Sequence, residues 1–240
     1  MKGQIPVAKD LMPRHIALIM DGNGRWAKIH NVPRKIGHRE GAKAFNKIAE
    51  YAQTIGIEYL TVYAFSTENW KRSKEEVDAL MSLLESYLEK LDEFAKKNIR
   101  LIVLGDMGPL SPSLVKKIKL AEEQSKNNTG MTVNIALNYG GRDELVNAVK
   151  KIATFCEKGE LSSNDITEKM ISENLYTGHQ PDPDVIIRPS GEKRLSNFLL
   201  WQAAYAELVF MDVLWPDFSE RDLDKAIVEY ANRDRRFGGR

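Results

Sequence analysis

The residues Asp21, Gly22, Asn23 and Gly24 form a short polar segment whose residue types suit the binding of an anion. Glycine and asparagine tolerate positive φ, so a turn here can point backbone N–H groups at a phosphate, and the dipole of a following helix favours negative charge there. An acidic residue beside a phosphate needs a cation between them, and Mg²⁺ prefers oxygen ligands such as the Asp21 carboxylate. The alternative for these residues alone is a tight turn in which Asp21 caps a helix. No Gly-Lys-Ser/Thr follows, so the segment is not a P-loop.

A set of arginines and one histidine indicates where a diphosphate could bind. Arg34 and His38 lie about one helical turn apart, and a guanidinium group can bond phosphate oxygens at two points. The same basic run would also serve as an ordinary solvated helix face, and His38 is either a proton-handling group or a structural one. A binding site is favoured because further arginines, Arg72, Arg188 and Arg194, lie at the carboxyl ends of other predicted strands or in the segments after them.

The segment 73–97 predicts the clearest helix of the chain. Ser73 with Glu76 three residues later is a capping-box signature. Aliphatic residues then recur at helical spacing, and Leu83 and Tyr87 widen the apolar face beyond one buried stripe. Such a helix is either a deeply buried core helix or the wall of an apolar pocket that holds a long hydrocarbon. A diphosphate site beside an apolar pocket would suit an isoprenoid diphosphate.

The elements that must position these residues alternate between strands and helices. Short apolar runs predict buried strands, at 15–20, 59–65, 99–104, 132–137 and 185–188, with a sixth within 207–213. Amphipathic segments predict helices, at 41–54, 73–97, 111–125, 142–157, 167–175 and 219–230. This alternation implies right-handed crossovers and a mostly parallel sheet. We therefore expect a single α/β domain over 1–240, with a central six-stranded sheet flanked by helices and a flexible N-terminus at 1–12.

In such a sheet, ligands bind beyond the carboxyl ends of the strands. The segments that follow four of the predicted strands are all polar, and three of them combine glycine with arginine. These segments are 21–26, 66–72, 138–142 and 189–194. We expect them to converge on one site.

Composition limits the other classes of function. Lys+Arg 35 against Asp+Glu 34 leaves a formal net charge of +1, so no overall field attracts nucleic acid, and any anion site must be local. The single cysteine, Cys156, excludes an internal disulfide and a cysteine-rich zinc site. Residues 1–10 lack the apolar core of a secretory signal, and the longest apolar stretch, 197–215, is interrupted by Glu207 and Asp212. We expect a cytoplasmic protein.

Long blocks of this sequence resemble the cis-prenyltransferases, which are isoprenyl diphosphate synthases. The matching blocks are HIALIMDGNGRWA at 15–27, GHREGA at 37–42, LTVYAFSTENWKRS at 60–73, NYGGRDE at 138–144, IRPSGEKRLSNFLLWQAAYAE at 187–207, VLWPDF at 213–218 and NRDRRFGG at 232–239. They occur in order over nearly the whole chain, so chance agreement is negligible. The resemblance implies an α/β domain with an apolar substrate tunnel.

The resemblance also implies a role for each matching position. Asp21 would hold Mg²⁺ on a substrate diphosphate and would be essential together with Asn69, and Glu207 would be a second acidic metal residue. The allylic diphosphate site would comprise Gly22, Asn23, Gly24, Arg25, Trp26, Arg34 and His38. The substrate pocket would be lined by Ser66, Thr67, Glu68, Trp70 and Arg72. The diphosphate of isopentenyl diphosphate would bind at Arg188, Arg194, Leu195 and Ser196, and Arg236 would reach a partner subunit's site.

The implied reaction is the sequential addition of isopentenyl diphosphate to farnesyl diphosphate with cis geometry, in which Mg²⁺ assists ionisation of the allylic diphosphate. The implied product is the C55 compound undecaprenyl diphosphate, the precursor of the lipid carrier for bacterial cell-wall synthesis. The enzyme would be a transferase and a homodimer. Its apolar product would bring it into loose, peripheral contact with a membrane surface.

Several alternatives stay open at this stage. The proton acceptor is Asn69, Asp21 or the substrate diphosphate, because a neutral amide is a poor base and a metal-bound carboxylate is a compromised one. Product length depends on pocket depth, so a related enzyme with a shorter or longer product is the alternative within the family. A non-catalytic partner subunit of the same fold is the alternative outside catalysis. Pro189 stands where the family pattern has threonine, and the lost backbone N–H predicts altered affinity with the chemistry retained.

Overall fold

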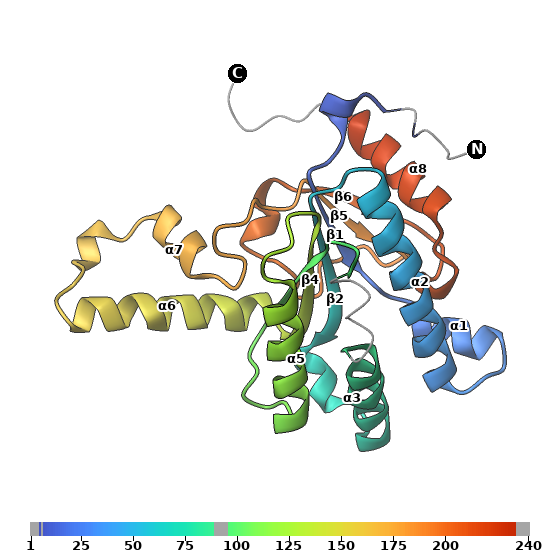
Figure 1. The fold of residues 1–240 in the computed structure, drawn as a ribbon, viewed down its shortest axis with the longest axis horizontal. Coiled ribbons are helices and arrows are strands. Elements are labelled where there is room, and N and C mark those ends of the chain that lie inside the picture. Colours follow the sequence, from blue (N-terminus) through green and yellow to red (C-terminus); the bar gives the residue numbers. More distant parts are fainter. Residues whose placement is uncertain (1–4, 6, 89–95, 234–240) are drawn as a thin grey trace.

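The computed structural model describes residue 5, residues 7–88 and residues 96–233, and its centre is a six-stranded sheet (Figure 1). The strands are β1 (His15–Ile19), β2 (Tyr59–Ser66), β3 (Arg100–Leu104), β4 (Thr132–Tyr139), β5 (Val185–Arg188) and β6 (Glu207–Phe210). Their order across the sheet is β3-β4-β2-β1-β5-β6, and each neighbouring pair is parallel. The six predicted strands and the α/β fold class are confirmed.

Helices follow most of the strands. They are α1 (Asn23–Ile29), α2 (Arg34–Thr54), α3 (Lys74–Leu88), α5 (Pro112–Ser125), α6 (Gly141–Glu157), α7 (Glu168–Asn174) and α8 (Glu220–Ala231). All of these except α1 correspond to predicted helices. Residues 89–95 of the predicted helix 73–97 lie outside the described residues. The N-terminal segment contains a short 3-10 helix, η1 (Lys9–Leu11), while residues 1–4 and 6 lie outside the description, so the flexibility of 1–12 stays a prediction.

The two faces of the sheet are covered differently. On one face, α2, α3, α5 and α8 pack apolar side chains such as Ile48, Ile118 and Ile227 against the strands. On the other face, the irregular chain between β5 and β6 supplies Phe198 and Leu199. Figure 1 shows α6 and α7 extending together away from the sheet. Within the described ranges, no helix has the length and apolar character needed to cross a membrane.

The start of α2 differs from the prediction, because α2 begins at Arg34 rather than at residue 41. Gly37 and Gly41 are weak helix formers, which obscured the first turns in the sequence. In the fold they let α1 approach closely, since a Cβ at Gly37 would lie 2.2 Å from the carbonyl oxygen of Asn23. A Cβ at Gly41 would lie 2.1 Å from Asn23 Oδ1. The two glycines therefore fix α1, and with it Asn23, against α2.

Candidate active site

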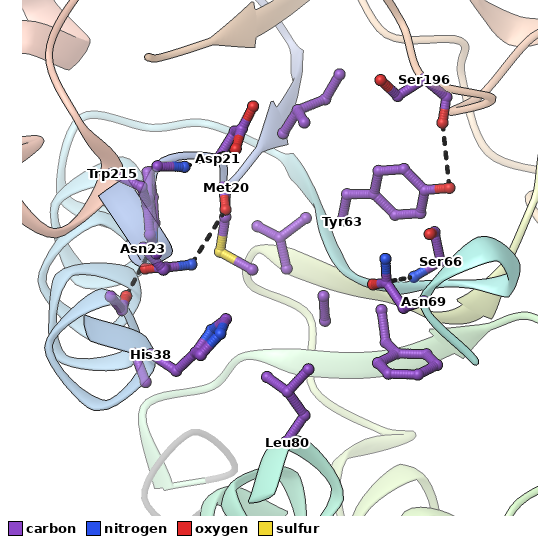
Figure 2. Close-up of a pocket in the computed structure, with 18 of the residues that line it drawn as sticks. Met20, Asp21, Asn23, His38, Tyr63, Ser66, Asn69, Leu80, Ser196 and Trp215 are labelled. Atoms are coloured by element: carbon purple, nitrogen blue, oxygen red, sulfur yellow. Dashed lines mark hydrogen bonds between the residues drawn. The ribbon is translucent and has the colours of Figure 1, made fainter. Parts of the chain in front are cut away.

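A cavity of about 840 Å³ lies at the carboxyl ends of the central strands and extends between α2 and α3 (Figure 2). β1 and β5 are neighbours in the sheet, but the chain leaves β1 toward β2 on its other side. This change of direction is a topological switch point, where open parallel sheets bind ligands. The volume lies within the range of small-molecule sites.

The cavity has a polar mouth and an apolar interior. The predicted residues that line it are Asp21, Gly22, Asn23, Gly24, Arg25, Arg34, His38, Ser66, Glu68, Asn69, Arg72, Arg188, Arg194 and Ser196. Apolar side chains line the rest, among them Phe45 of α2, Val62 of β2, Leu80 and Leu84 of α3, Val103 of β3 and Ile135 of β4. The helix that begins near residue 73, predicted as a possible pocket wall, therefore borders the cavity, and the strand that begins at residue 132 borders it as well.

Asp21 lies directly beyond β1 and is surrounded by donors. The Gly22 N–H donates to Asp21 Oδ1 at 2.7 Å, and Arg188 Nη2 and Arg25 Nη2 donate to Oδ2 at 2.9 and 3.4 Å. Burial alone would raise the pKa of Asp21, but the hydrogen bond and charge of Arg188, with help from Ser190 and Arg25, outweigh it and lower the pKa. The carboxylate is therefore held in its charged form.

Arg188 connects this carboxylate to the loop after β5. Its side chain is 4% exposed, and Nη1 donates to Ser196 Oγ at 2.8 Å and also to the carbonyl oxygen of Arg194. The Nε atom is buried without a hydrogen-bond partner among the described residues. One guanidinium group thus fixes the position of the segment that the sequence assigned to isopentenyl diphosphate.

Arg25 is held by Ser190, which lies in the polar segment 189–194 that we expected at the site but was not among the individually predicted site residues. Its two terminal nitrogens donate to the Ser190 carbonyl oxygen at 2.7 Å and to Ser190 Oγ at 2.6 Å. Ser190 has a φ of 82°, in the left-handed region that most side chains avoid. The fold therefore uses an unfavourable backbone conformation to bring the β5 loop against α1.

Glu76 of α3 pairs with two cationic groups of the mouth. Its carboxylate accepts from Arg34 Nη1 at 2.5 Å and from Arg72 Nη1 at 2.7 Å. The predicted capping box is only half present: the Glu76 N–H donates to Ser73 Oγ at 3.3 Å, while the carboxylate binds the arginines instead. The carboxylate thus makes one tertiary contact, with Arg34 of α2, and one contact with Arg72 four residues earlier in the chain.

His38 faces the same group of charges and is neutral at neutral pH. Its Nε2 atom lies 3.9 Å from Glu76 Oε1, too far for a hydrogen bond, and is buried without a partner in the described part of the chain. Burial, with the nearby charges of Arg72 and Arg34, lowers the pKa of His38 to about 4 despite the opposing charge of Glu76. A neutral imidazole here can donate or accept one hydrogen bond at the cavity wall.

Asn69 lies in the 3-10 turn η2 (Thr67–Lys71), directly after β2. The Ser66 N–H donates to Asn69 Oδ1 at 3.1 Å, and the Ser66 side chain accepts from the Asn69 backbone, which makes a reciprocal capping box (Figure 2). The side-chain amide oxygen of Asn69, Oδ1, thus points toward the backbone of Ser66. Its amide NH₂ is the end that can donate to a ligand.

Two tryptophans that were predicted at the site, Trp26 and Trp70, make their contacts outside the cavity lining. Trp26 stacks on His30 with ring centroids 3.9 Å apart, and its Nε1 donates to Asp217 Oδ1 at 2.8 Å. Trp70 Nε1 donates to Asn138 Oδ1 at 2.7 Å. Neither tryptophan lines the cavity, so both contribute to the packing of the loops around it.

Other predicted positions also lie away from the cavity lining. Thr67 and Leu195 do not border it, and neither does the polar segment 138–142, which we expected to converge with the other three. Tyr139, in that segment, is fully buried beneath the loops because β4 continues to this residue. Arg236 lies outside the described residues.

Glu207 lies at the amino ends of the parallel strands, whereas Asp21 lies beyond their carboxyl ends. Glu207 is the first residue of β6 and pairs with Val185, which is level with Ile16 of β1. Asp21 lies beyond Ile16 in the strand direction by roughly 16 Å, at about 3.3 Å per residue. Glu207 instead accepts from Arg233 Nη1 at 2.7 Å. Within a single chain Glu207 and Asp21 therefore lie too far apart to bind the same metal ion, because Glu207 begins its strand whereas Asp21 follows one, and the predicted metal role of Glu207 stays a prediction.

Several lining residues were not predicted as site residues. They are Met20, Gly41, Tyr63, Glu76, Asn197 and Trp215. Trp215 is almost fully buried and donates from Nε1 to the Gly41 carbonyl oxygen at 2.8 Å. All but Glu76 lie within the sequence blocks that carry the family resemblance, which was the available signal for them.

Comparisons with known proteins agree with these motifs. The sequence profile of the family described as "Putative undecaprenyl diphosphate synthase" matches residues 19–238. The ditrans,polycis-undecaprenyl-diphosphate synthase ((2E,6E)-farnesyl-diphosphate specific) of Micrococcus luteus is 50% identical over 229 residues, which cover 95% of this chain and 92% of that protein. An isoprenyl transferase of Clostridium perfringens is 50% identical over 237 residues, which cover 98% and 94%.

Solved structures show the same fold. Lavandulyl diphosphate synthase from Lavandula x intermedia, in complex with dimethylallyl diphosphate, superposes with a TM-score of 0.94 at 39% identity, over 96% of this chain and 100% of that chain. A probable undecaprenyl diphosphate synthase from Campylobacter jejuni gives 0.78 at 37% identity, over 95% and 99%.

The fold, the motifs and these relatives together define a cis-prenyltransferase, and the protein is therefore an enzyme of the transferase class. Within that class, the chain belongs to the undecaprenyl diphosphate synthase family, and its activity is cis-prenyl chain elongation.

Proposed function

We propose that this enzyme adds isopentenyl diphosphate to farnesyl diphosphate and repeats the addition until undecaprenyl diphosphate, a C55 product, is formed. In each cycle the bond between C1 of the allylic substrate and its diphosphate oxygen breaks, and pyrophosphate leaves with the bonding electrons. C1 then bonds to the terminal alkene carbon of isopentenyl diphosphate, and loss of a proton forms the new cis double bond. The farnesyl-diphosphate-specific name of the Micrococcus luteus relative supports this allylic substrate.

The observation that carries the proposal is that one cavity joins a cationic mouth to an apolar interior. The mouth can hold two diphosphates close together, which favours reaction between their hydrocarbon ends. Side chains such as Leu80 and Ile135 would surround the growing chain. Each buried CH₂ stabilises the bound chain by about 0.8 kcal/mol, so intermediates would stay bound while the cavity has room.

Two neighbouring groups of residues would bind the diphosphates. Arg188, which is buried and already aligned with Ser196, would hold isopentenyl diphosphate together with Arg194. Arg25 and Arg34 would hold the allylic diphosphate at α1 and α2. Fixed cationic groups stabilise the leaving diphosphate more strongly as its negative charge grows, which lowers the barrier to ionisation.

Mg²⁺ is the cofactor that we propose for the ionisation step. This ion commonly binds one or two carboxylates together with waters and substrate phosphates, and the partly exposed, ionised Asp21 carboxylate at the diphosphate mouth fits that pattern. The described residues contain no group of three or more side chains able to hold a metal ion by themselves. The substrate would therefore supply further oxygens. When bound, Mg²⁺ would neutralise charge on the leaving diphosphate.

The geometry bears on the proton acceptor. The Asn69 side chain accepts a hydrogen bond from the Ser66 N–H through Oδ1, so its side-chain NH₂ group would orient a substrate oxygen rather than accept a proton. Asp21 has a lowered pKa, which makes it a weak base. We therefore assign proton acceptance to an oxygen of the departing pyrophosphate, with Asp21 and Asn69 both essential for positioning charge.

The test is incubation of the purified protein with farnesyl diphosphate, radiolabelled isopentenyl diphosphate and Mg²⁺, followed by resolution of products by chain length. We expect a single C55 product that is lost with EDTA or with Asp21→Asn. A shorter or longer product would keep the chemistry and identify a related enzyme of different chain length. No incorporation by correctly folded protein would favour the non-catalytic partner subunit.

We also propose a homodimer in which the arm formed by α6 and α7 contributes to the interface. Val146 and Val149, one turn apart on α6, are 50% and 58% exposed on this projecting element (Figure 1). Val149→Glu should lower the mass measured by light scattering from that of a dimer to that of a monomer. Arg236→Ala should weaken binding of isopentenyl diphosphate more than that of the allylic substrate if this terminal arginine reaches the partner's site.

A cytoplasmic location with peripheral membrane contact remains part of the proposal. The contact follows from the product, because a C55 chain partitions strongly into lipid. Vesicle flotation with and without bound product tests it: we expect flotation to increase with product, and equal flotation would contradict a product-dependent contact.

A further inference from the structure

We infer that Asn197 is a positioning residue that holds the loop of the isopentenyl diphosphate site against η2, an inference that rests on the proposed function. Asn197 Nδ2 donates to Glu68 Oε1 of η2 at 2.9 Å, and Oδ1 accepts from the Arg142 N–H at 2.9 Å. The main-chain carbonyl oxygen of Asn197 accepts from the Gly141 N–H at 2.7 Å. Both backbone donors belong to the first turn of α6. One residue thus links three of the loops at the carboxyl edge.

The loop between β5 and β6 needs such an anchor because its backbone is strained. Ser190, Ser196, Asn197 and Leu199 have φ values of 82°, 51°, 64° and 45°. Residues other than glycine adopt these left-handed conformations only where surrounding contacts hold them there, and asparagine tolerates them better than most. Without the anchor, the segment that carries Arg194 would be free to relax toward ordinary backbone angles.

Gly140 shows how closely the three loops meet. Its φ of −156° is available to any residue, so its backbone conformation does not require glycine. A Cβ at this position, however, would lie 2.7 Å from Asn197 Nδ2 and 2.7 Å from Thr67 Oγ1. The segment 138–142 does not line the cavity, but at Gly140 it packs closely against the loops that carry Asn197 and Thr67.

Asn197 lies between two parts of the proposed site. On one side, the adjacent Ser196 accepts from Arg188 at the isopentenyl diphosphate site. On the other side, Glu68 is next to Asn69, which lines the cavity below the mouth. Breaking the contact between Asn197 and Glu68 would change the separation of the two sites. Because bond formation requires both hydrocarbon ends to be held close together, we expect kcat to fall in variants that remain folded.

Asparagine suits this position because its short side chain carries a donor and an acceptor together. Asn197→Asp keeps the acceptor for Arg142 and the tolerance of positive φ, but it removes the donor and places a second negative charge beside Glu68. Adding Glu68→Gln supplies a donor from the other side, so that the pair is restored with its direction reversed.

The chain offers a matched control at Asn147 of α6. Asn147 Nδ2 donates to Asp143 Oδ2 at 3.1 Å and to the Tyr176 hydroxyl at 2.7 Å, outside the cavity lining. Asn147→Asp therefore creates a comparable contact between two carboxylates away from the site. We expect it to lower the Tm about as much as Asn197→Asp does, while kcat and both KM values stay within about twofold of the wild type.

The experiment is steady-state kinetics of the full chain with farnesyl and isopentenyl diphosphates. We expect Asn197→Asp to lower kcat at least about tenfold and to raise the KM for isopentenyl diphosphate, with the KM for farnesyl diphosphate nearly unchanged. Glu68→Gln in that background should recover a large part of kcat. An equal loss in Asn147→Asp, an equal rise in both KM values, or a double variant no more active than Asn197→Asp would overturn the inference.

Hydrogen exchange provides a readout that needs no turnover. In Asn197→Asp the backbone amides of residues 67–71 should exchange at least about tenfold faster than in the wild type, and in the double variant they should return toward the wild-type rate. Unchanged exchange would overturn the positioning role even if the enzyme were active. If the wild-type protein forms no prenyl product while the two variants show these exchange rates, the proposed function is refuted and the structural role of Asn197 is kept.

Discussion

Arg188 Nη2 lies 2.9 Å from Asp21 Oδ2, and this contact joins the ends of two strands that are neighbours in the sheet but distant in the sequence. Arg188 is almost fully buried, whereas Asp21 is partly exposed and lines the cavity. A buried guanidinium thus lies behind a carboxylate that faces the cavity. Because the same guanidinium also holds Ser196, the site for one diphosphate is coupled to the position of the acid that would serve the other.

Arg188→Lys should therefore be far from conservative. A single ammonium group cannot reach Asp21, Ser196 and the Arg194 carbonyl oxygen together in the geometry of the guanidinium. We expect kcat/KM for isopentenyl diphosphate to fall about 100-fold, which corresponds to about 2.7 kcal/mol of transition-state stabilisation. Steady-state kinetics with each substrate varied in turn measure this, and a value within threefold of the wild type would contradict the coupling described above.

Gly37→Ala should destabilise the protein although alanine is the better helix former. In an exposed helix the change would stabilise by about 1 kcal/mol. Here the new Cβ would lie 2.2 Å from the backbone carbonyl oxygen of Asn23, so α1 must move. We expect the free energy of unfolding in urea to fall by about 1–3 kcal/mol, and the KM for farnesyl diphosphate to rise. Lys47→Ala, on the exposed side of α2, should show neither effect.

Ile135→Phe should shorten the product. Ile135 lines the apolar part of the cavity from β4, and a larger ring there reduces the space left for the growing chain. We expect the main product to lose one or more C5 units relative to the wild type, as seen by thin-layer or mass analysis of labelled products. Leu120→Phe, at an exposed position of α5, is the control and should leave product length unchanged. An unaltered product from Ile135→Phe would show that the chain takes another path.

His15 should make the stability of the protein depend on pH. This side chain is 1% exposed, with Nδ1 donating to the Pro181 carbonyl oxygen and Nε2 accepting from the Thr61 hydroxyl, both at 2.7 Å. Burial lowers the pKa of His15 from 6.5 to about 4, although the Pro181 carbonyl and the Asp184 charge oppose this. Between these two values the unfolded chain binds more protons than the folded one, so stability falls as the pH falls.

At pH 5 this effect amounts to about 2 kcal/mol relative to pH 7, at about 1.4 kcal/mol per unit of pKa. His15→Gln does not titrate in this range. Urea denaturation at the two pH values should therefore show a smaller loss for His15→Gln than for the wild type, by about 2 kcal/mol. Equal losses in the two proteins would show that His15 is not the responsible group.

The strands were predictable because residues buried on both faces leave a local signal. All five residues of β1 and all eight of β4 are buried, which the continuous apolar runs had indicated. A polar residue that ends or follows such a run marks a carboxyl end, so Asp21, beyond β1, and Arg188, the last residue of β5, were placed at the same end of the sheet. The start of α2 was missed because Gly37 and Gly41 look unfavourable for a helix until the contact with α1 is known.

Contacts between distant segments left no comparable signal. Glu76 had the spacing of a capping box, yet its carboxylate binds Arg34 of α2, a charged tertiary contact, as well as Arg72 four residues earlier in the chain. Asn197 followed the predicted site by one residue, but nothing in its neighbours along the chain indicated that Glu68 lies opposite. Hydrogen bonds of this kind depend on the path of two loops and not on either sequence alone.

The sequence by itself determined the α/β class and the family, because periodicity and motifs are local properties of the chain, and it supplied the residues that we predict to bind diphosphate and metal. Only the tertiary structure decided which of them meet. The strand order β3-β4-β2-β1-β5-β6 places β1 beside β5 and so brings Asp21 to Arg188, whereas Glu207 pairs with Val185 at the amino ends of the strands. Strand order and register arise from pairing between segments far apart in sequence, and no local pattern specifies them.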